Sequence, residues 1–376
     1  MKIVIAPDKF KGSLTGAEFC DSVEKGLRSV LDNLDITKMP LADGGDGTIE
    51  ILDYHLTGKY INLVVNDPLF RSINASYFYL PTIQTAFIEM AEASGMKLLK
   101  IDEQNCMNTT TYGIGELILD AIKKGARKIV VGIGGSATND CGIGMASALG
   151  YRFLDKFDKE VIPIGKNLND VKSIDNSQVN KELKNVAFKV ACDVSNPLYG
   201  PNGAAYVYAS QKGASKSEVE LLDKGLRNLA HIFQDQYNTD VQKINGGGAA
   251  GGMGVGTKMF LDASLTSGID LIKEMIGFDE SLKNTDWIIT GEGKLDDQTL
   301  SGKTIQGVIN SVVQNNINVA AFCGKSELNE NELKKLGISY IDEVMNYTNN
   351  FDDAITNSSK YVEVMAQIFA KKLKDK

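Results

Sequence analysis

Residues 128–149 constrain the fold of this chain more than any other stretch. They begin with apolar residues typical of a buried strand, continue through Gly132, Gly134 and Gly135, and end in residues 143–149, which have the pattern of a helix. Glycine lets a backbone bend sharply and approach a ligand closely, which a side chain would prevent. The stretch therefore predicts a strand, a glycine loop and a helix in succession, as in α/β proteins.

The polar residues between these glycines and the helix are Ser136, Thr138, Asn139 and Asp140. Residues of these types commonly cap helix N-termini, where their side chains accept hydrogen bonds from free N–H groups. A strand, a glycine turn and a helix N-terminus together form an anion site, because those N–H groups and the helix dipole point outward. We expect this loop to bind phosphate or carboxylate, although a tight strand-to-helix turn explains the same pattern.

Strands and helices alternate at both ends of the chain, and polar loops follow the strands. Predicted strands lie at 3–6, 36–39, 287–290, 319–322 and 339–341. In open α/β sheets, ligands bind at the carboxyl ends of the strands, so residues in these loops are candidates for a functional site. Thr15 and Glu18 have the spacing of a capping box, which predicts a helix after the first loop.

The middle of the chain has a different texture, because short alternating runs between residues 60 and 91 predict antiparallel strands. A chain of 376 residues is long for a single core, so two domains are expected. We predict a Rossmann-like α/β domain with a parallel sheet, formed by residues 1–62 and 245–376. A second, inserted α/β domain is predicted at 63–244, with the active site in the cleft between the two. A flexible linker is an alternative interpretation of the glycine-rich residues 246–256.

The overall composition limits the possible partners and the compartment. A net charge of −8 without a basic stripe argues against a nucleic-acid or membrane-surface partner. No apolar run approaches the roughly 18 residues of a membrane span, and the first residues are typical of a strand and not of a signal peptide. The five cysteines form no C-x-x-C pair, which is typical of reduced thiols. We therefore expect a cytoplasmic protein, and the sequence does not indicate its oligomeric state.

Two nucleotide-binding motifs fit the chain poorly. The GKT at 302–304 resembles the end of a Walker A loop, but that motif requires glycine where the chain has Asp297. The spacing from Gly132 to Ala137 satisfies the relaxed dinucleotide fingerprint, and Asp155 lies near the expected acidic position. No clear second strand of a dinucleotide-binding unit leads to Asp155, however. A dinucleotide-dependent oxidoreductase is therefore a minor alternative.

Acidic residues follow most of the predicted strands. They are Asp8, Asp43, Asp46, Asp193, Glu292, Asp296 and Asp297. Each one alone is explained as a turn former or helix cap, but a set of them at strand ends favours a shared cleft. Phosphoryl transfer needs carboxylates for Mg²⁺ and for a base, together with amides and cations for the phosphate oxygens. Lys11 and Lys294 lie in the same loops and could supply the cations.

Seven segments of the chain together match one family. They are APDKFKGSL at 6–14, LADGGDGT at 41–48, TTTYGIGE at 109–116, GIGGSATND at 132–140, ACDVSNPL at 191–198, GGAAGG at 247–252 and TGEGKLD at 290–296. In this set the chain resembles the type-1 (bacterial) glycerate kinases, with departures at Lys9, Asp46 and Lys294, where serine, glutamate and arginine are common. The resemblance implies a two-domain α/β enzyme that uses ATP and Mg²⁺ to phosphorylate D-glycerate. The implied product is 2-phosphoglycerate, with 3-phosphoglycerate left open.

Roles in this reaction follow from loop position and from the number of acids. The predicted catalytic residues are Asp193, Asp43, Lys11 and Lys294. Either aspartate would accept the hydroxyl proton of glycerate, and the lysines would neutralise phosphate or the glycerate carboxylate. Glu292 and Asp296 are predicted to hold Mg²⁺. The predicted substrate- and phosphate-binding residues are Asp8, Ser13, Gly44, Asp46, Gly134, Gly135, Ser136, Ala137, Thr138, Asn139, Gly251 and Gly252. A kinase for another small hydroxy acid and a non-catalytic sensor of small anions are the alternatives.

Overall fold

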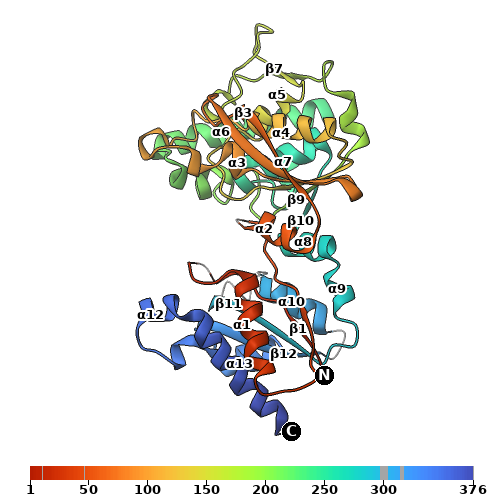
Figure 1. Ribbon diagram of the computed structural model, residues 1–376. Coiled ribbons are helices and arrows are strands. Elements are labelled where there is room, and N and C mark those ends of the chain that lie inside the picture. The colour runs from red at the N-terminus through yellow and green to blue at the C-terminus, as the bar shows by residue number, and fades with distance from the viewer. Residues whose placement is uncertain (11, 46, 297–303, 314–316, 376) are drawn as a thin grey trace. The chain divides into compact units, whose positions relative to one another are not determined.

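The computed structural model describes residues 1–10, 12–45, 47–296, 304–313 and 317–375 (Figure 1). Contacts within the chain divide it into two units. Unit 1 comprises Met1–Asp43, Glu50–His55 and Ile269–Lys376, and unit 2 comprises Gly44–Ile49 and Leu56–Gly268. The sequence-based boundaries near residues 62 and 244 differ from these, chiefly because residues 245–268 belong to unit 2. Both units combine helices with sheets that are mainly parallel, which confirms the predicted α/β class.

Within the described residues, unit 1 is built on a five-stranded parallel sheet. Its order is β13 (Ile338–Glu343), β12 (Asn318–Ser326), β11 (Trp287–Leu295), β1 (Lys2–Ile5) and β2 (Asp35–Lys38). Successive residues of a strand point to opposite faces of a sheet, so Ile3 and Ile5 join one hydrophobic core and Val4 joins the other. Both faces are buried, and this is why the inner strands are continuous apolar runs.

Helices cover both faces of this sheet. On one face, α1 (Gly16–Arg28) and α13 (Ser358–Lys374) lie side by side (Figure 1). On the other face, α9 (Phe278–Ser281) and α10 (Thr304–Val312) contribute to the core around Val4. The predicted capping box starts α1, since Thr15 Oγ1 accepts the N–H of Glu18 and the Glu18 carboxylate accepts the N–H of Thr15. Further helices are α2 (Thr48–His55), α8 (Gly268–Ile276), α11 (Glu330–Lys335) and α12 (Phe351–Thr356).

Strand β11 is longer than predicted. The sequence predicts a strand over 287–290 and a loop over 291–297, whereas β11 continues to Leu295. The glycines in this stretch do not end the strand, because β12 pairs with it as far as Leu295 opposite Ser326. Glu292 and Lys294 therefore belong to a sheet, where the backbone hydrogen bonds of two strands fix their positions.

Unit 2 has a mixed six-stranded sheet within the described part of the chain. Its order is β10 (Ser264–Thr266), β9 (Ala187–Ala191), β6 (Lys128–Gly132), β5 (Thr85–Glu89), β4 (Ser72–Leu80) and β3 (Lys59–Asn66). The first four strands are parallel, and β4 and β3 are antiparallel, as the alternating runs predicted. Outside this sheet, β7 (Arg152–Leu154) pairs in antiparallel with β8 (Ser173–Asp175). The strand before Asp155 is thus not the parallel strand that a dinucleotide-binding unit requires.

The glycine-rich residues 246–256 are buried within unit 2. They lead into α7 (Ala249–Leu261), which packs beside α5 (Ile143–Ala148), and a Cβ added to Gly256 would lie 2.3 Å from Cys141 O. The alternative of a flexible linker is therefore wrong. Further helices of this unit are α3 (Ala91–Ser94), α4 (Tyr112–Lys123) and α6 (Lys216–Tyr237). No helix in the described part of the chain has both the length and the apolar character needed to cross a membrane.

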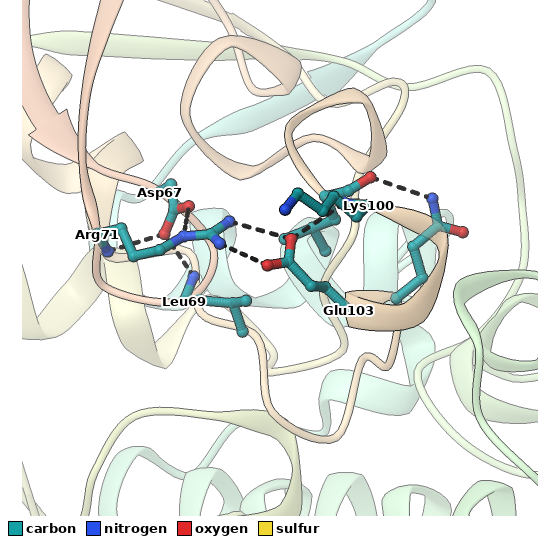
Figure 2. Close-up of polar contacts among 7 residues, drawn as sticks. Asp67, Leu69, Arg71, Lys100 and Glu103 are labelled. Atoms are coloured by element: carbon teal, nitrogen blue, oxygen red, sulfur yellow. Dashed lines mark hydrogen bonds and ion pairs between the residues drawn. The ribbon is translucent and has the colours of Figure 1, made fainter.

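Charged side chains fix the turn between β3 and β4 (Figure 2). Asp67 is buried, and its Oδ1 accepts the N–H groups of Leu69 and Arg71, both at 2.8 Å. Arg71 Nε donates to Asp67 Oδ2 at 2.6 Å, and Arg71 Nη1 donates to Glu103 Oε1 at 2.7 Å (Figure 2). Each charge in this cluster has a partner of opposite sign, which indicates a structural role.

Candidate active site

The carboxyl edge of the unit 1 sheet carries three of the predicted acids. Asp43 follows β2, Asp8 follows β1, and Glu292 lies in β11. Because these strands are parallel neighbours, their carboxyl ends share one edge of the sheet. The N–H of Asp8 donates to Gly291 O at 2.8 Å, which ties Asp8 to the residue before Glu292. We call this the acidic edge of unit 1.

Hydrogen bonds and burial define the acids of this edge. Asp8 Oδ1 accepts the N–H of Lys9 at 2.7 Å, and Asp8 Oδ2 accepts the hydroxyl of Thr304, at the start of α10, at 2.6 Å. Glu292 is 7% exposed and lies opposite Cys323 of β12. Burial raises the pKa of the Cys323 thiol well above its usual value, and the charge of Glu292 adds to this effect. The thiol therefore stays protonated at neutral pH.

Lys294 and Asp296 form an ion pair at the end of β11. Lys294 Nζ lies 3.5 Å from Asp296 Oδ2 and 2.9 Å from Glu327 Oε2, and the lysine side chain is half-exposed. The hydrogen bond with Glu327 is the main reason why the pKa of Lys294 is raised. Lys294 is therefore fully charged at neutral pH, but a phosphate group would have to compete with two carboxylates for it.

The predicted metal ligands form a partial set. Among the described residues, no three His, Cys, Asp or Glu side chains lie close enough together to hold a metal ion by themselves. In phosphoryl-transfer sites, Mg²⁺ usually takes one or two carboxylates, and substrate oxygens and water complete its coordination. Glu292 and Asp296 supply hard oxygen ligands at the end of one strand. Their oxygens are of the type that Mg²⁺ prefers, and the described residues form no complete protein cage around them.

Ser13 is engaged in packing within unit 1. Its hydroxyl lies 2.5 Å from Ser358 Oγ and 3.2 Å from Ile355 O, so it fastens the first loop to the start of α13 and the end of α12. Ser13 was predicted to bind substrate or phosphate, but in the described chain its hydroxyl contacts α12 and α13. Three other predicted positions, Lys11, Asp46 and Asp297, lie outside the described residues.

The carboxyl edge of the unit 2 sheet carries glycines where unit 1 carries acids. Gly44 has a φ of +86°, and a Cβ added to it would lie 2.8 Å from Ala191 Cβ at the end of β9. A Cβ added to Gly132, at the end of β6, would lie 2.9 Å from Gly44 O. Gly45 in turn lies beside Gly134. The structure thus brings the predicted residues Gly44 and Gly134 together, and we call this the glycine edge of unit 2.

Gly134 differs from the other predicted glycines in that packing does not require it. Its φ is not left-handed, and the nearest atom to an added Cβ is Gly45 Cα at 3.8 Å, an ordinary contact. Gly135 has a φ of +69°, which favours glycine. Gly251 has a φ of +72°, and its Cβ would lie 2.1 Å from Thr138 O. The last position therefore serves the packing of α7 on the loop, whereas Gly134 is open to an approaching ligand.

Asp193 lies at the glycine edge of unit 2. It follows β9, it is exposed, and its Oδ1 accepts the N–H of Gly268 at 2.9 Å. A Cβ added to Gly44 would lie 2.9 Å from Gly268 Cα, so Asp193 and Gly44 share a neighbour. Asp193 is thus an exposed carboxylate with a backbone hydrogen bond to orient it. Asp43, the other predicted base, belongs to the acidic edge of unit 1.

The N–H groups at the start of α5 are hydrogen-bonded within the protein. Asp140 is 1% exposed, and its carboxylate accepts Thr111 N and Oγ1 at 2.8 Å, Gly142 N at 3.1 Å and Gly144 N at 3.2 Å. Burial raises the pKa of Asp140, and these hydrogen bonds oppose the effect by favouring the carboxylate. Asp140 thus supplies the predicted capping, whereas residues 136–139 do not cap the helix. Any ligand of the loop must use groups other than this helix N-terminus.

The loop before α5 contains buried polar groups that the rest of the described chain does not satisfy. Thr138 and Asn139 are fully buried, and neither Thr138 Oγ1 nor the side-chain amide of Asn139 has a hydrogen-bond partner among the described residues. Ala137 is tied into the fold, since its N–H donates to Ser94 O at 2.9 Å and its carbonyl accepts the Thr109 hydroxyl at 2.8 Å. Unsatisfied buried polar groups are rare and cost about 1–3 kcal/mol each, so bound water or a polar ligand group is needed to satisfy them.

Lys212 contacts this loop and was not predicted. It ends the short 3-10 segment Ser210–Lys212, and it is 5% exposed. Its Nζ donates to Ser136 Oγ at 2.6 Å and to Thr138 O at 2.8 Å. Burial lowers its pKa from the usual 10.5 to about 8. Sequence reasoning missed Lys212 because it lies 76 residues from Ser136, in a polar stretch that follows no predicted strand.

The chain thus has two α/β units, with carboxylates at the carboxyl edge of one sheet and glycine loops at the carboxyl edge of the other, where α/β enzymes commonly bind their ligands. A family model described as the Glycerate kinase family matches residues 3–374. The chain therefore belongs to the glycerate kinase family, as its motifs indicated, and it is an enzyme of the kinase class.

Individual relatives are similar over nearly their whole length. The chain is 39% identical to the glycerate kinase of Bacillus subtilis over 374 residues, which cover 100% of this chain and 98% of that protein. It is 39% identical to the glycerate 2-kinase of Escherichia coli, with 94% of this chain and 93% of that protein covered. A solved structure of "putative glycerate kinase 2" from Salmonella typhimurium LT2 matches with a TM-score of 0.89 at 38% identity, covering 100% of this chain and 98% of that one.

Proposed function

We propose that this protein is an ATP-dependent kinase that phosphorylates D-glycerate to 2-phosphoglycerate with the help of Mg²⁺. The observation that carries the proposal is the family match over residues 3–374, which includes the acidic edge of unit 1 and the glycine edge of unit 2. The relative named glycerate 2-kinase, at 39% identity, supports the 2-position. The alternative product is 3-phosphoglycerate, and the experiment below distinguishes the two.

Asp193 is the first candidate for the base. Phosphoryl transfer to a hydroxyl is helped by a carboxylate that accepts the hydroxyl proton as the new P–O bond forms. Asp193 is exposed at the end of β9, and the N–H of Gly268 orients its carboxylate. Asp43, at the end of β2, is the alternative base.

Glu292 and Asp296 are the proposed ligands of Mg²⁺. The bound ion would neutralise negative charge on the phosphate oxygens that are transferred. Asp8, which Thr304 orients through a 2.6 Å hydrogen bond, is another carboxylate of the acidic edge, beside Glu292. Lys294 is charged and half-exposed, so it can neutralise a phosphate oxygen if it exchanges Asp296 or Glu327 for that oxygen.

The glycine edge of unit 2 would bind an anionic oxygen of one substrate. Gly134 leaves the backbone of the loop open to close approach, and Gly44 shapes the same edge. Ser136 adds a hydroxyl directly after these glycines. Backbone and hydroxyl donors of this kind stabilise anionic oxygens when the fold holds them in place.

Product analysis tests this proposal directly. The full chain would be incubated with ATP, Mg²⁺ and D-glycerate, and ADP release and the ³¹P spectrum of the product would be recorded. Phosphorus at the 2-position couples to one proton and gives a doublet, whereas phosphorus at the 3-position couples to two and gives a triplet. A panel of other small hydroxy acids measures acceptor preference. If another acid is phosphorylated faster than D-glycerate, that acid is the preferred acceptor. Binding of ATP and glycerate without ADP release would indicate a sensor.

The proposed partners are small molecules. The net charge of −8 argues against nucleic acid as a partner, and D-glycerate and ATP carry the negative charge that the site would neutralise locally. All five cysteines are free thiols. On the cysteine pattern of the sequence, we place the reaction in the cytoplasm.

A further inference from the structure

We infer that Lys212 is a positioning residue whose charge makes Ser136 a hydrogen-bond donor to an anionic oxygen of a substrate. This inference deepens the proposed function and rests on it. The chemistry shared by both substrates is an oxygen anion, either the carboxylate of the acceptor or a phosphate of the nucleotide. The experiment below distinguishes these two sources.

Lys212 is the donor in the hydrogen bond with Ser136. An ammonium group only donates hydrogen bonds, so at 2.6 Å Ser136 Oγ must be the acceptor. The hydroxyl proton of Ser136 then points away from Lys212. Within the described residues this proton has no acceptor, and Ser136 itself is 7% exposed at the end of the glycine loop. A hydroxyl that accepts from a cation is a stronger donor, so it suits an anionic oxygen.

The buried ammonium of Lys212 has only neutral hydrogen-bond partners in the described chain. Its Nζ donates to two neutral acceptors, Ser136 Oγ and Thr138 O, and it forms no ion pair among the described residues. A buried cation normally has an anionic partner, because burial without one is costly. The charged group that faces it is Asp140, whose carboxylate is already bound by four donors. The other titratable group is Cys106, and burial raises its pKa to about 11, so it is a neutral thiol.

A purely structural role for the ammonium is less consistent with its surroundings. The backbone around Lys212 is already fixed, since Cys106 N–H donates to Lys212 O at 3.0 Å. The next residue, Gly213, has a φ of +86°, and a Cβ added to it would lie 1.7 Å from Gln104 O. A neutral side chain could hold Ser136 equally well without the burial of a charge. The side chains of Thr138 and Asn139, fully buried and without partners in the described chain, lie in the same loop, so the polar groups around Lys212 are not a closed hydrogen-bond network.

The test uses the full chain with Lys212→Met, Ser136→Ala and a control, Lys273→Met. Lys273 is also a buried lysine, but it bonds to Asp270 and to Gly307 O in unit 1. The KM values for D-glycerate and for ATP would be measured separately, and the Kd values for D-glycerate alone and for ADP alone by calorimetry. If Ser136 donates a charge-assisted hydrogen bond, the KM and Kd of one of the two substrates should increase by about 10–100-fold in Lys212→Met. The values for the other substrate should not change. Ser136→Ala should weaken binding of the substrate affected by Lys212→Met, and Lys273→Met should weaken neither.

The pH profile separates positioning from mere packing. Since burial lowers the pKa of Lys212 to about 8, the affinity of the wild-type protein for that substrate should fall above this pH. In Lys212→Met the affinity should be low and independent of pH in this range.

The inference is overturned if both Kd values stay within about 2-fold of wild type, or if the affinity for both substrates falls equally. Should Lys212→Met not fold, an unchanged Kd for both substrates in Ser136→Ala overturns it. Failure of the wild-type protein to release ADP would refute the proposed kinase instead, and the binding arms would still test Lys212.

Discussion

At the carboxyl edge of the unit 1 sheet the functional groups are acids, whereas at the carboxyl edge of the unit 2 sheet they are mainly glycines and hydroxyls. Asp8, Asp43 and Glu292 belong to three neighbouring parallel strands of unit 1, and carboxylates so placed attract a cation. In unit 2, Gly134 opens the backbone to a ligand, and Lys212 places a positive charge behind the loop. The same sheet geometry therefore presents groups of different charge, depending on the residues that end the strands.

The two edges also differ in how function and stability are linked. The acids can be replaced by amides of the same shape, so chemistry can be removed while the fold is retained. The glycines mix two roles, because some are required by packing and others are not.

The largest expected effect is on the base. Asp193→Asn keeps an oxygen for the N–H of Gly268 but cannot accept a proton, so kcat should fall by about 10²–10⁴-fold with little change in melting temperature. Steady-state ADP release and thermal melting would measure both. If Asp43→Asn lowers kcat more than Asp193→Asn does, the base belongs to the acidic edge of unit 1 and not to the glycine edge of unit 2.

Two glycine-to-alanine variants should separate packing from ligand approach. Gly251→Ala places a Cβ 2.1 Å from Thr138 O at a φ of +72°, so it should lower the free energy of unfolding by about 2–5 kcal/mol. Gly134→Ala meets only an ordinary contact at 3.8 Å and should change it by less than about 0.5 kcal/mol. Its KM for one substrate should nevertheless rise. Denaturant unfolding and steady-state kinetics measure the pair. An unchanged KM in Gly134→Ala would show that the loop does not approach a ligand at this residue.

The stability of the protein should depend on the protonation of Lys212. Its pKa is lowered from 10.5 to about 8, so the unfolded state binds more protons between these values and stability rises with pH in that window. Relative to Lys212→Met, the wild-type protein should gain about 3 kcal/mol of unfolding free energy from below pH 8 to above pH 10.5. The contributions of the other titratable groups to the pH dependence are the same in both proteins, so they cancel in the difference. Chemical denaturation of both proteins across this pH range measures the difference, and parallel curves would contradict the burial of a charged Lys212.

The acidic edge is tested by Glu292→Gln. Glutamine keeps the shape of this buried side chain in β11 but removes the charge that holds a cation, so kcat at low Mg²⁺ should fall on the order of 100-fold. Raising the Mg²⁺ concentration should restore part of the activity. Asp352→Asn, an exposed change in α12, is the control and should leave the Mg²⁺ dependence unchanged. An undisturbed Mg²⁺ dependence in Glu292→Gln would remove this residue from the metal site.

Much of this protein can be predicted from its sequence because the relevant signals are local. The apolar residues around Ile3 and Val131 predict strands, Thr15 and Glu18 predict the start of α1, and seven motifs indicate the family. Placing acids at strand ends also brought Asp8, Asp43 and Glu292 to one sheet edge, because parallel strands share their carboxyl ends. Each of these inferences depends on residues that are neighbours in the chain or on a general rule of sheet topology.

Only the tertiary structure decided which polar groups are engaged and which are available. It showed that Asp140 fills the start of α5, that the Ser13 hydroxyl contacts α12 and α13, and that packing requires Gly251 but not Gly134. It also brought Lys212 to Ser136 from 76 residues away. The sequence specifies the donors and acceptors, but their partners come from distant segments, and burial, which sets the energy of each charge, exists only after the chain has folded.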